Sequence, residues 1–175
     1  MYDKKFISLL SVVGLCSGIL SELSFRFFSS YLPGVIFGLF IGWVFLKERL
    51  LEGDRLGKLI LFMAASTFAW IVAFYTTMII GAQSTAPGMA GMEYPAYAIG
   101  GAVGGFLFLR FFSAIIQKIS YKHILFGTLL SSGIALLSIL ILRLIPIFVI
   151  WQTGMAIMIG ACTKIEISEP KQQKG

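Results

Sequence analysis

The chain has 175 residues, of which 58% are apolar and 13% are charged, whereas about 25% of an average globular protein is charged. This composition excludes an ordinary water-soluble domain, and the sixteen Phe and nineteen Gly residues are typical of helices that pack in lipid. The net charge of +6 does not indicate a nucleic-acid partner, because the basic residues lie between apolar runs and form no dense patch.

The N-terminal segment starts as a secretory signal does, with Lys4 and Lys5 ahead of an apolar stretch. No cleavage site of the small-x-small type follows, so we expect an uncleaved first membrane span. Its helix has to continue through Glu22 and Arg26 to cross the bilayer, and these two residues lie at helical i,i+4 spacing.

Five further apolar segments follow along the chain, separated by charged residues. A hydrocarbon core of about 30 Å requires about 20 helical residues, and each segment reaches or approaches this length with its flanks. We therefore predict an all-α integral membrane protein with one six-span domain, residues 1–163, and a short polar tail, residues 164–175. The predicted spans cover residues 6–28, 31–48, 59–82, 95–112, 124–142 and 144–163.

Proline marks the start of the second, fourth and sixth spans, at Pro33, Pro95 and Pro146. A proline in the first turn of a helix costs no hydrogen bond, because that N–H has no partner within the helix. The spans therefore form three up-down hairpins.

The basic residues predict an orientation. If the N-terminus is inside, the inner segments are residues 1–5, 47–58, 110–123 and 164–175. They hold all but two of the 14 Lys and Arg residues, and Arg26 and Arg143 are the exceptions. By the positive-inside rule both termini are cytoplasmic, and we expect a bacterial plasma membrane as the location.

Glycine recurs at every fourth position in the second and fourth spans, which places the glycines on one face of each helix. We interpret these faces as GxxxG-type packing seams. They pack either within the chain, or against a second copy or a partner membrane subunit. The residues are Gly34, Gly38 and Gly42 in the second span, and Gly100, Gly101, Gly104 and Gly105 in the fourth.

Polar residues near the predicted outer side are candidates for a solute site, although charges at helix ends also commonly pair with each other or extend to the headgroups. The amide within the sixth span needs partners in lipid, either on a neighbouring helix or on a ligand. The candidate polar residues are Glu22, Arg26, Glu93, Arg143 and Gln152, and the candidate pocket walls are Tyr31, Tyr94, Tyr97 and Trp151.

Motifs for catalysis or cofactor binding are scarce. His123 is the single histidine, which makes a metal site improbable, and no GxxxxGK[ST], HExxH or CxxC occurs. We therefore expect no enzymatic activity, no cofactor, no metal and no catalytic residues.

Our leading hypothesis is a small non-enzymatic membrane subunit that binds or passes a small solute from the outer side, as a homo-oligomer or with partner subunits. In length and span count the chain is similar to the small six-helix solute-binding subunits of vitamin importers, without matching motifs. The alternative is a structural or assembly subunit that docks a partner membrane protein through its glycine seams. An intramembrane enzyme is the third hypothesis.

Overall fold

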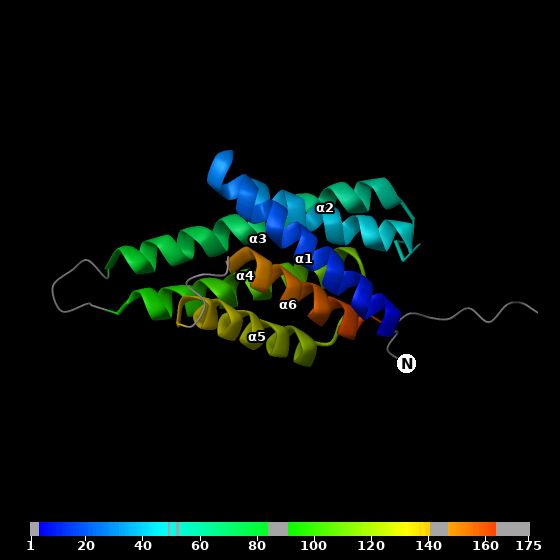
Figure 1. The fold of residues 1–175 in the computed structure, drawn as a ribbon. Coiled ribbons are helices and arrows are strands. Elements are labelled where there is room, and N and C mark those ends of the chain that lie inside the picture. Colours follow the sequence, from blue (N-terminus) through cyan, green and yellow to red (C-terminus); the bar gives the residue numbers. More distant parts are fainter. Residues whose placement is uncertain (1–3, 49, 52, 84–90, 141–146, 164–175) are drawn as a thin grey trace, which may run out of the picture.

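A computed structural model describes residues 4–48, 50–51, 53–83, 91–140 and 147–163. These residues form six α-helices and no strand, so the all-helical prediction is confirmed for this part of the chain (Figure 1). The predicted tail 164–175, the outer Arg143 and the start of the sixth span lie outside the described residues. The helices are α1 (Lys4–Phe27), α2 (Leu32–Lys47), α3 (Arg55–Ala82), α4 (Glu93–Ile115), α5 (Tyr121–Leu140) and α6 (Ile147–Cys162).

Four of the helices, α1, α3, α4 and α5, are long and apolar enough to cross a membrane. The helices α2 and α6 have 16 residues each, which corresponds to about 24 Å at 1.5 Å per residue. This length is shorter than a hydrocarbon core of about 30 Å. By length and composition, the four long helices are compatible with a multi-pass membrane protein.

Local sequence signals explain where α2 and α3 begin. Pro33 lies in the first turn of α2, where its missing N–H costs nothing. The carboxylate of Asp54 caps α3 by accepting a hydrogen bond from the Gly57 N–H at 3.0 Å. Gly53 precedes this cap with a φ of 68°, in the left-handed region that glycine enters without steric cost.

The helices alternate in direction, and each packs against the next along the chain (Figure 1). The last helix, α6, packs against α1, so the six helices form a closed ring. One end of this bundle carries the start of α1 and the α2–α3 connection. The other end carries the α1–α2 connection and the start of α4.

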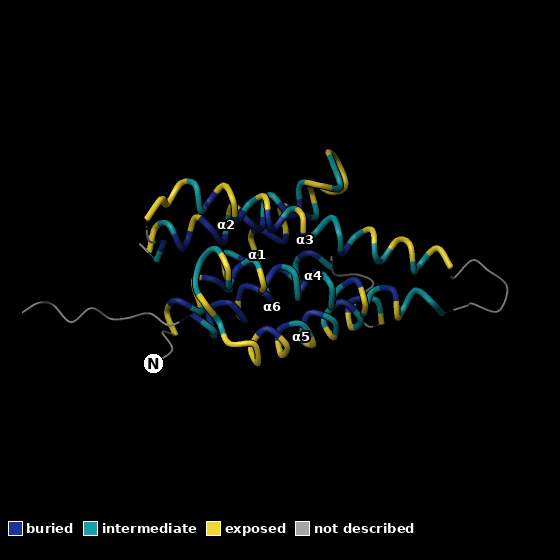
Figure 2. The backbone as a smooth tube through the Cα atoms, turned by 180° about the vertical axis from the view of Figure 1, so that it is seen from behind, coloured by how far each residue is buried: buried dark blue, intermediate teal, exposed yellow. Residues whose placement is uncertain are grey.

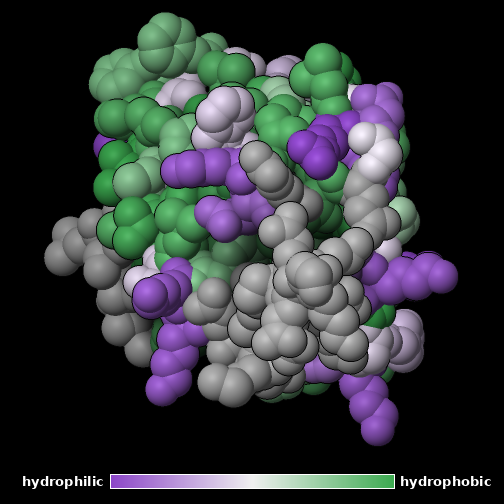
Figure 3. Space-filling model, turned by 90° about the vertical axis from the view of Figure 1, so that its right-hand side faces the viewer, coloured by the Kyte–Doolittle hydropathy of each residue, from purple (hydrophilic) through white to green (hydrophobic). Residues whose placement is uncertain are grey.

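The charged residues are distributed unevenly between the two ends. Hydrophilic side chains gather on the end that holds the start of α1 (Figure 3). Among the described residues, Arg26 is the one basic residue near the opposite end. The basic residues of the first end, called the basic end below, are Lys4, Lys5, Lys47, Arg55, Lys58, Lys118 and Lys122, with Arg110 one turn and a half before the end of α4.

Phenylalanine rings fill the half of the interior nearer the basic end. Phe45 and Phe112 pack edge to face with their ring centroids 5.3 Å apart. Phe108 continues this core, with its ring centroid 5.0 Å from that of Phe37 and 5.5 Å from that of Phe62. All five side chains are fully buried, so α2, α3 and α4 share one aromatic core.

The outward faces of the helices are exposed (Figure 2) and carry many large apolar side chains. Leu129 is 72% exposed, Ile79 65% and Val12 56%. Water-soluble monomers rarely expose large continuous apolar surface, whereas lipid chains solvate it. The surface therefore suits insertion into a membrane.

Candidate functional site

Glycines set the spacing between α4 and its two neighbours. Gly104 faces α3, where an added Cβ would lie 2.8 Å from the Cβ of Ala73, and Gly100 meets Thr77 of the same helix. Gly101 faces α5 instead, where an added Cβ would lie 2.6 Å from the Cβ of Ala135. Gly105 also faces α5, at Ser131. Both neighbours can therefore approach the α4 backbone more closely than any side chain would permit.

The three glycines of α2 face α3. An added Cβ would lie 2.6 Å from Thr67 Cα at Gly34 and 2.8 Å from Met63 Cα at Gly38, and at Gly42 it would meet the side chain of Leu59. All seven glycines named from the sequence thus contact helices of the same chain.

A cavity of about 180 Å³ lies within the ring, in the half away from the basic end. Its wall comes from five helices, all except α2, and it is almost entirely apolar. Six aromatic side chains contribute to it, with small residues of α3, α4 and α5 between them. The lining residues are Phe25, Trp70, Ala73, Phe74, Thr77, Met78, Tyr97, Gly100, Gly101, Gly104, Ala135, Ile147, Phe148 and Trp151.

Four of the rings form a continuous cluster that joins α1, α3 and α6. The ring centroid of Phe148 lies 4.9 Å from that of Trp70 and 5.3 Å from that of Phe25. Phe74 completes the cluster, 5.9 Å from Phe25 and 5.8 Å from Trp70. These side chains therefore bridge α3 to α1 and α6 beside the cavity.

Most polar side-chain groups of the lining form hydrogen bonds within the protein. The Trp70 ring N–H donates to the Ser30 carbonyl at 2.6 Å. The Trp151 ring N–H donates to the Ser131 hydroxyl at 2.6 Å, and the Thr77 hydroxyl donates to the carbonyl four residues back. The Tyr97 hydroxyl makes no hydrogen bond to any other residue that the structure describes. Among the side-chain hydroxyl and ring N–H groups of the lining residues, that of Tyr97 is thus the one without a partner in the described part of the chain.

Two of the candidate residues from the sequence, Tyr97 and Trp151, line this cavity. Gln152 lies beside a smaller cavity of about 10 Å³ and is only 2% exposed. Its amide nitrogen donates to the Ser21 hydroxyl at 2.9 Å and to the Pro33 carbonyl at 3.4 Å. Its partners are therefore on α1 and at the start of α2.

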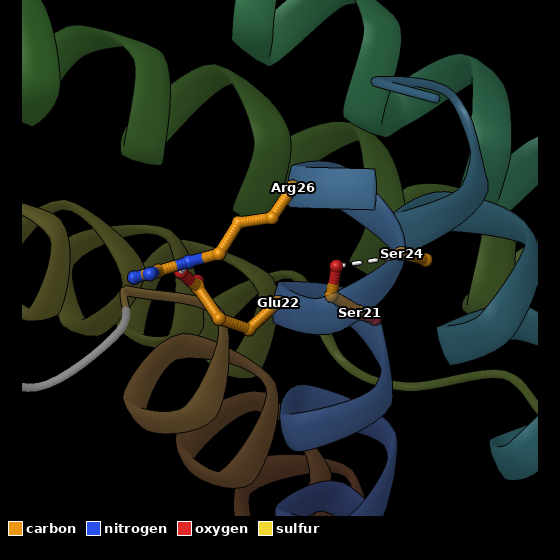
Figure 4. A network of polar contacts seen from close by, with 4 residues as sticks. All are labelled: Ser21, Glu22, Ser24 and Arg26. Atoms are coloured by element: carbon orange, nitrogen blue, oxygen red, sulfur yellow. Dashed lines mark hydrogen bonds and ion pairs between the residues drawn. The ribbon is translucent and has the colours of Figure 1, made fainter. Parts of the chain in front are cut away.

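The charged candidates that the structure describes, Glu22, Arg26 and Glu93, are not part of the cavity lining. Glu22 and Arg26 form an ion pair of 2.6 Å, in which the Arg26 side chain is 64% exposed. Figure 4 shows the two side chains reaching toward each other on one face of α1, while Ser21 and Ser24 occupy another. Glu93 lies in the first turn of α4, where a negative charge interacts favourably with the helix dipole.

The remaining wall candidates also lie apart from the cavity. Tyr31 is 49% exposed, and its hydroxyl lies 3.5 Å from that of Tyr75. Tyr94 is half-buried in the first turn of α4 and does not line the cavity.

Four aromatic residues of the lining were not predicted from the sequence, because an aromatic residue in a membrane span is an ordinary packing or interface residue. They are Phe25, Trp70, Phe74 and Phe148. The i,i+4 spacing of Trp70 and Phe74 was the available signal, since it places both rings on one face of α3.

The described residues include no group of three His, Cys, Asp or Glu side chains that could hold a metal ion. Comparison of the chain with protein-family models, curated proteins and solved structures found no match.

Proposed function

We propose that the chain is a six-span membrane protein with both termini in the cytoplasm, and that it binds a small solute in the aromatic cavity from the outer side. The observation that carries the proposal is the cavity itself, with its volume of about 180 Å³ and its wall from five helices. Ligand sites are typically concave, largely apolar and furnished with few polar groups.

The uneven charge distribution supports the proposed orientation. The basic end carries the described Lys residues, and cytoplasmic loops are enriched in Lys and Arg. The cavity lies in the opposite half of the bundle, and in the proposed orientation this half is nearer the outer side.

The assembly hypothesis receives less support. It relied on glycine faces that a partner membrane protein could occupy. Each of the seven glycines has a neighbouring helix of its own chain against it, so these faces are not free for a partner.

The test compares two tryptophan substitutions in α6. Ile147 lines the cavity and Ile150 does not, and both are partly exposed. Ile147→Trp fills the cavity, whereas Ile150→Trp is its matched control. We expect a solute library to contain compounds that raise the Tm of the purified wild type and of Ile150→Trp by several degrees, but not that of Ile147→Trp. If no compound distinguishes these proteins, the proposal is wrong.

The charged pair provides a second arm of the same experiment. Glu22 and Arg26 do not line the cavity, so the double change Glu22→Gln with Arg26→Gln should leave the Tm shift of each compound unchanged. Loss of binding in this variant would instead support the polar site considered from the sequence.

A further inference from the structure

We infer that the solute of this cavity is an uncharged aromatic molecule with one ring and at most one hydroxyl group, such as a simple phenol. The inference rests on the proposed solute-binding function and adds the chemical class. The volume of the cavity limits the size of its solute, and an apolar protein cavity of about 150 Å³ accepts benzene. The cavity of about 180 Å³ therefore has room for one ring and a small substituent.

The described lining is uncharged. Among the residues that the structure describes, no Asp, Glu, Lys, Arg or His side chain is part of it, so a charged solute would lose its hydration without gaining a counter-charge from them. Burying an ion without a counter-charge is costly. Ring faces recover part of that cost for a cation, most of all when it is desolvated, but the described lining offers no carboxylate to complete the compensation. An amino acid or a quaternary ammonium compound is therefore disfavoured.

The lining offers a solute few hydrogen bonds, because the ring N–H groups of Trp70 and Trp151 both donate to groups of the protein. A solute with several polar groups would leave most of them unsatisfied, which is unfavourable. The Tyr97 hydroxyl makes no hydrogen bond within the described part of the chain, so it can partner a single hydroxyl. Ring faces around it stack on an aromatic solute.

Three probes that share a fluorophenyl group test this class by ¹⁹F NMR on the full chain in lipid nanodiscs. They are 4-fluorophenol, the cation 4-fluorobenzyl-trimethylammonium and the zwitterion 4-fluorophenylalanine. We expect saturable binding of 4-fluorophenol to the wild type and to Ile150→Trp, above the background of empty nanodiscs. The two charged probes should bind at least tenfold more weakly.

Two cavity-filling variants are compared, so that a loss of binding caused by misfolding of one variant can be recognised. Ile147→Trp should abolish the saturable signal, and so should Met78→Trp, which enlarges a lining side chain that is 56% exposed. Tyr97→Phe should weaken 4-fluorophenol about fivefold, the effect of one lost hydrogen bond of about 1 kcal/mol. Fluorobenzene, which has no hydroxyl, should bind Tyr97→Phe and the wild type equally.

The outcomes separate the inference from the proposed function. Suppose that a charged probe binds the wild type, that both filling variants abolish this binding, and that 4-fluorophenol does not bind. The solute class is then wrong and the solute-binding function stands. If no probe or library compound loses its binding or its Tm shift in Ile147→Trp or Met78→Trp, the solute class and the solute-binding function are both wrong. An unchanged affinity of 4-fluorophenol for Tyr97→Phe would contradict the role of the Tyr97 hydroxyl.

Discussion

The amide of Gln152 joins three helices at one point. It is only 2% exposed, and it contacts Ser21 of α1 and the Pro33 carbonyl of α2. In an apolar interior without water, an unsatisfied polar group raises the free energy of the folded state, so such an amide must find partners within the protein. The sequence alone could predict that Gln152 needs a partner. It could not identify Ser21, because the two residues are 131 positions apart and meet only when α6 packs against α1.

Ser21→Ala should therefore destabilise the protein by about 1–2 kcal/mol, because the amide of Gln152 loses a buried partner. Ser17→Ala is the matched control, since Ser17 is equally buried and its hydroxyl donates to a carbonyl of its own helix. That carbonyl keeps its helical hydrogen bond, so the control should change stability little. Unfolding midpoints in an SDS titration, followed by tryptophan fluorescence, measure both. Equal losses in the two variants would contradict a role for the junction between helices.

At the scale of the helices, much of the pattern could be predicted from charges, prolines and apolar length. Pro33 marks the start of α2 within one residue, and Lys47 ends it. The partner of each glycine face could not be predicted. Gly100 and Gly101 are adjacent in the sequence, yet one faces α3 and the other α5. Four-residue spacing identifies a close-packing face, but the helix that occupies it depends on the tertiary arrangement.

Gly38→Ala should destabilise the protein by about 1–3 kcal/mol, the usual cost of forcing an extra methyl group into a packed interface. Its Cβ would lie 2.8 Å from Met63 Cα, a backbone atom that cannot rotate away. Gly133→Ala in α5 is the control, because no atom lies within 4 Å of a Cβ at that position. It should be neutral, or stabilising by up to about 1 kcal/mol through helix propensity. Similar unfolding midpoints for the two variants would show that α2 and α3 are not packed this closely.

At the scale of the molecule, the helical membrane architecture follows from composition, but the cavity does not. Its wall takes single residues or short runs from five helices, for example Phe25 from α1 and Ala135 from α5. From the sequence of its own span, each of these residues is expected to be an ordinary packing or lipid-facing residue. Glu22 and Arg26 were predicted as candidate site residues because charged residues are rare in this apolar sequence. A cavity lined by aromatic rings from several helices has no signature along the chain, because it depends on how those helices pack in three dimensions.

The proposed six spans and their orientation can be tested on a chain whose Cys16 and Cys162 are replaced by serine. Single cysteines are then introduced at Phe28, Glu48, Gln83 and Lys118, all of which are exposed and lie in or beside the connections between helices. With both termini in the cytoplasm, a membrane-impermeant maleimide should label Phe28→Cys and Gln83→Cys on intact cells. Glu48→Cys and Lys118→Cys should react only after permeabilisation.

The critical comparison is Phe28→Cys with Glu48→Cys, because α2 is the short helix between them. A 16-residue helix crosses the membrane only if its flanking residues or a locally thinner bilayer make up the missing length, which costs fractions of a kcal/mol per ångström. Lys47 at its end can extend its ammonium group to the headgroups and so reduce that cost. Labelling of both positions from the same side would show that α2 does not span. A cysteine appended after Gly175 applies the same criterion to α6, and it should be protected on intact cells as Lys118→Cys is.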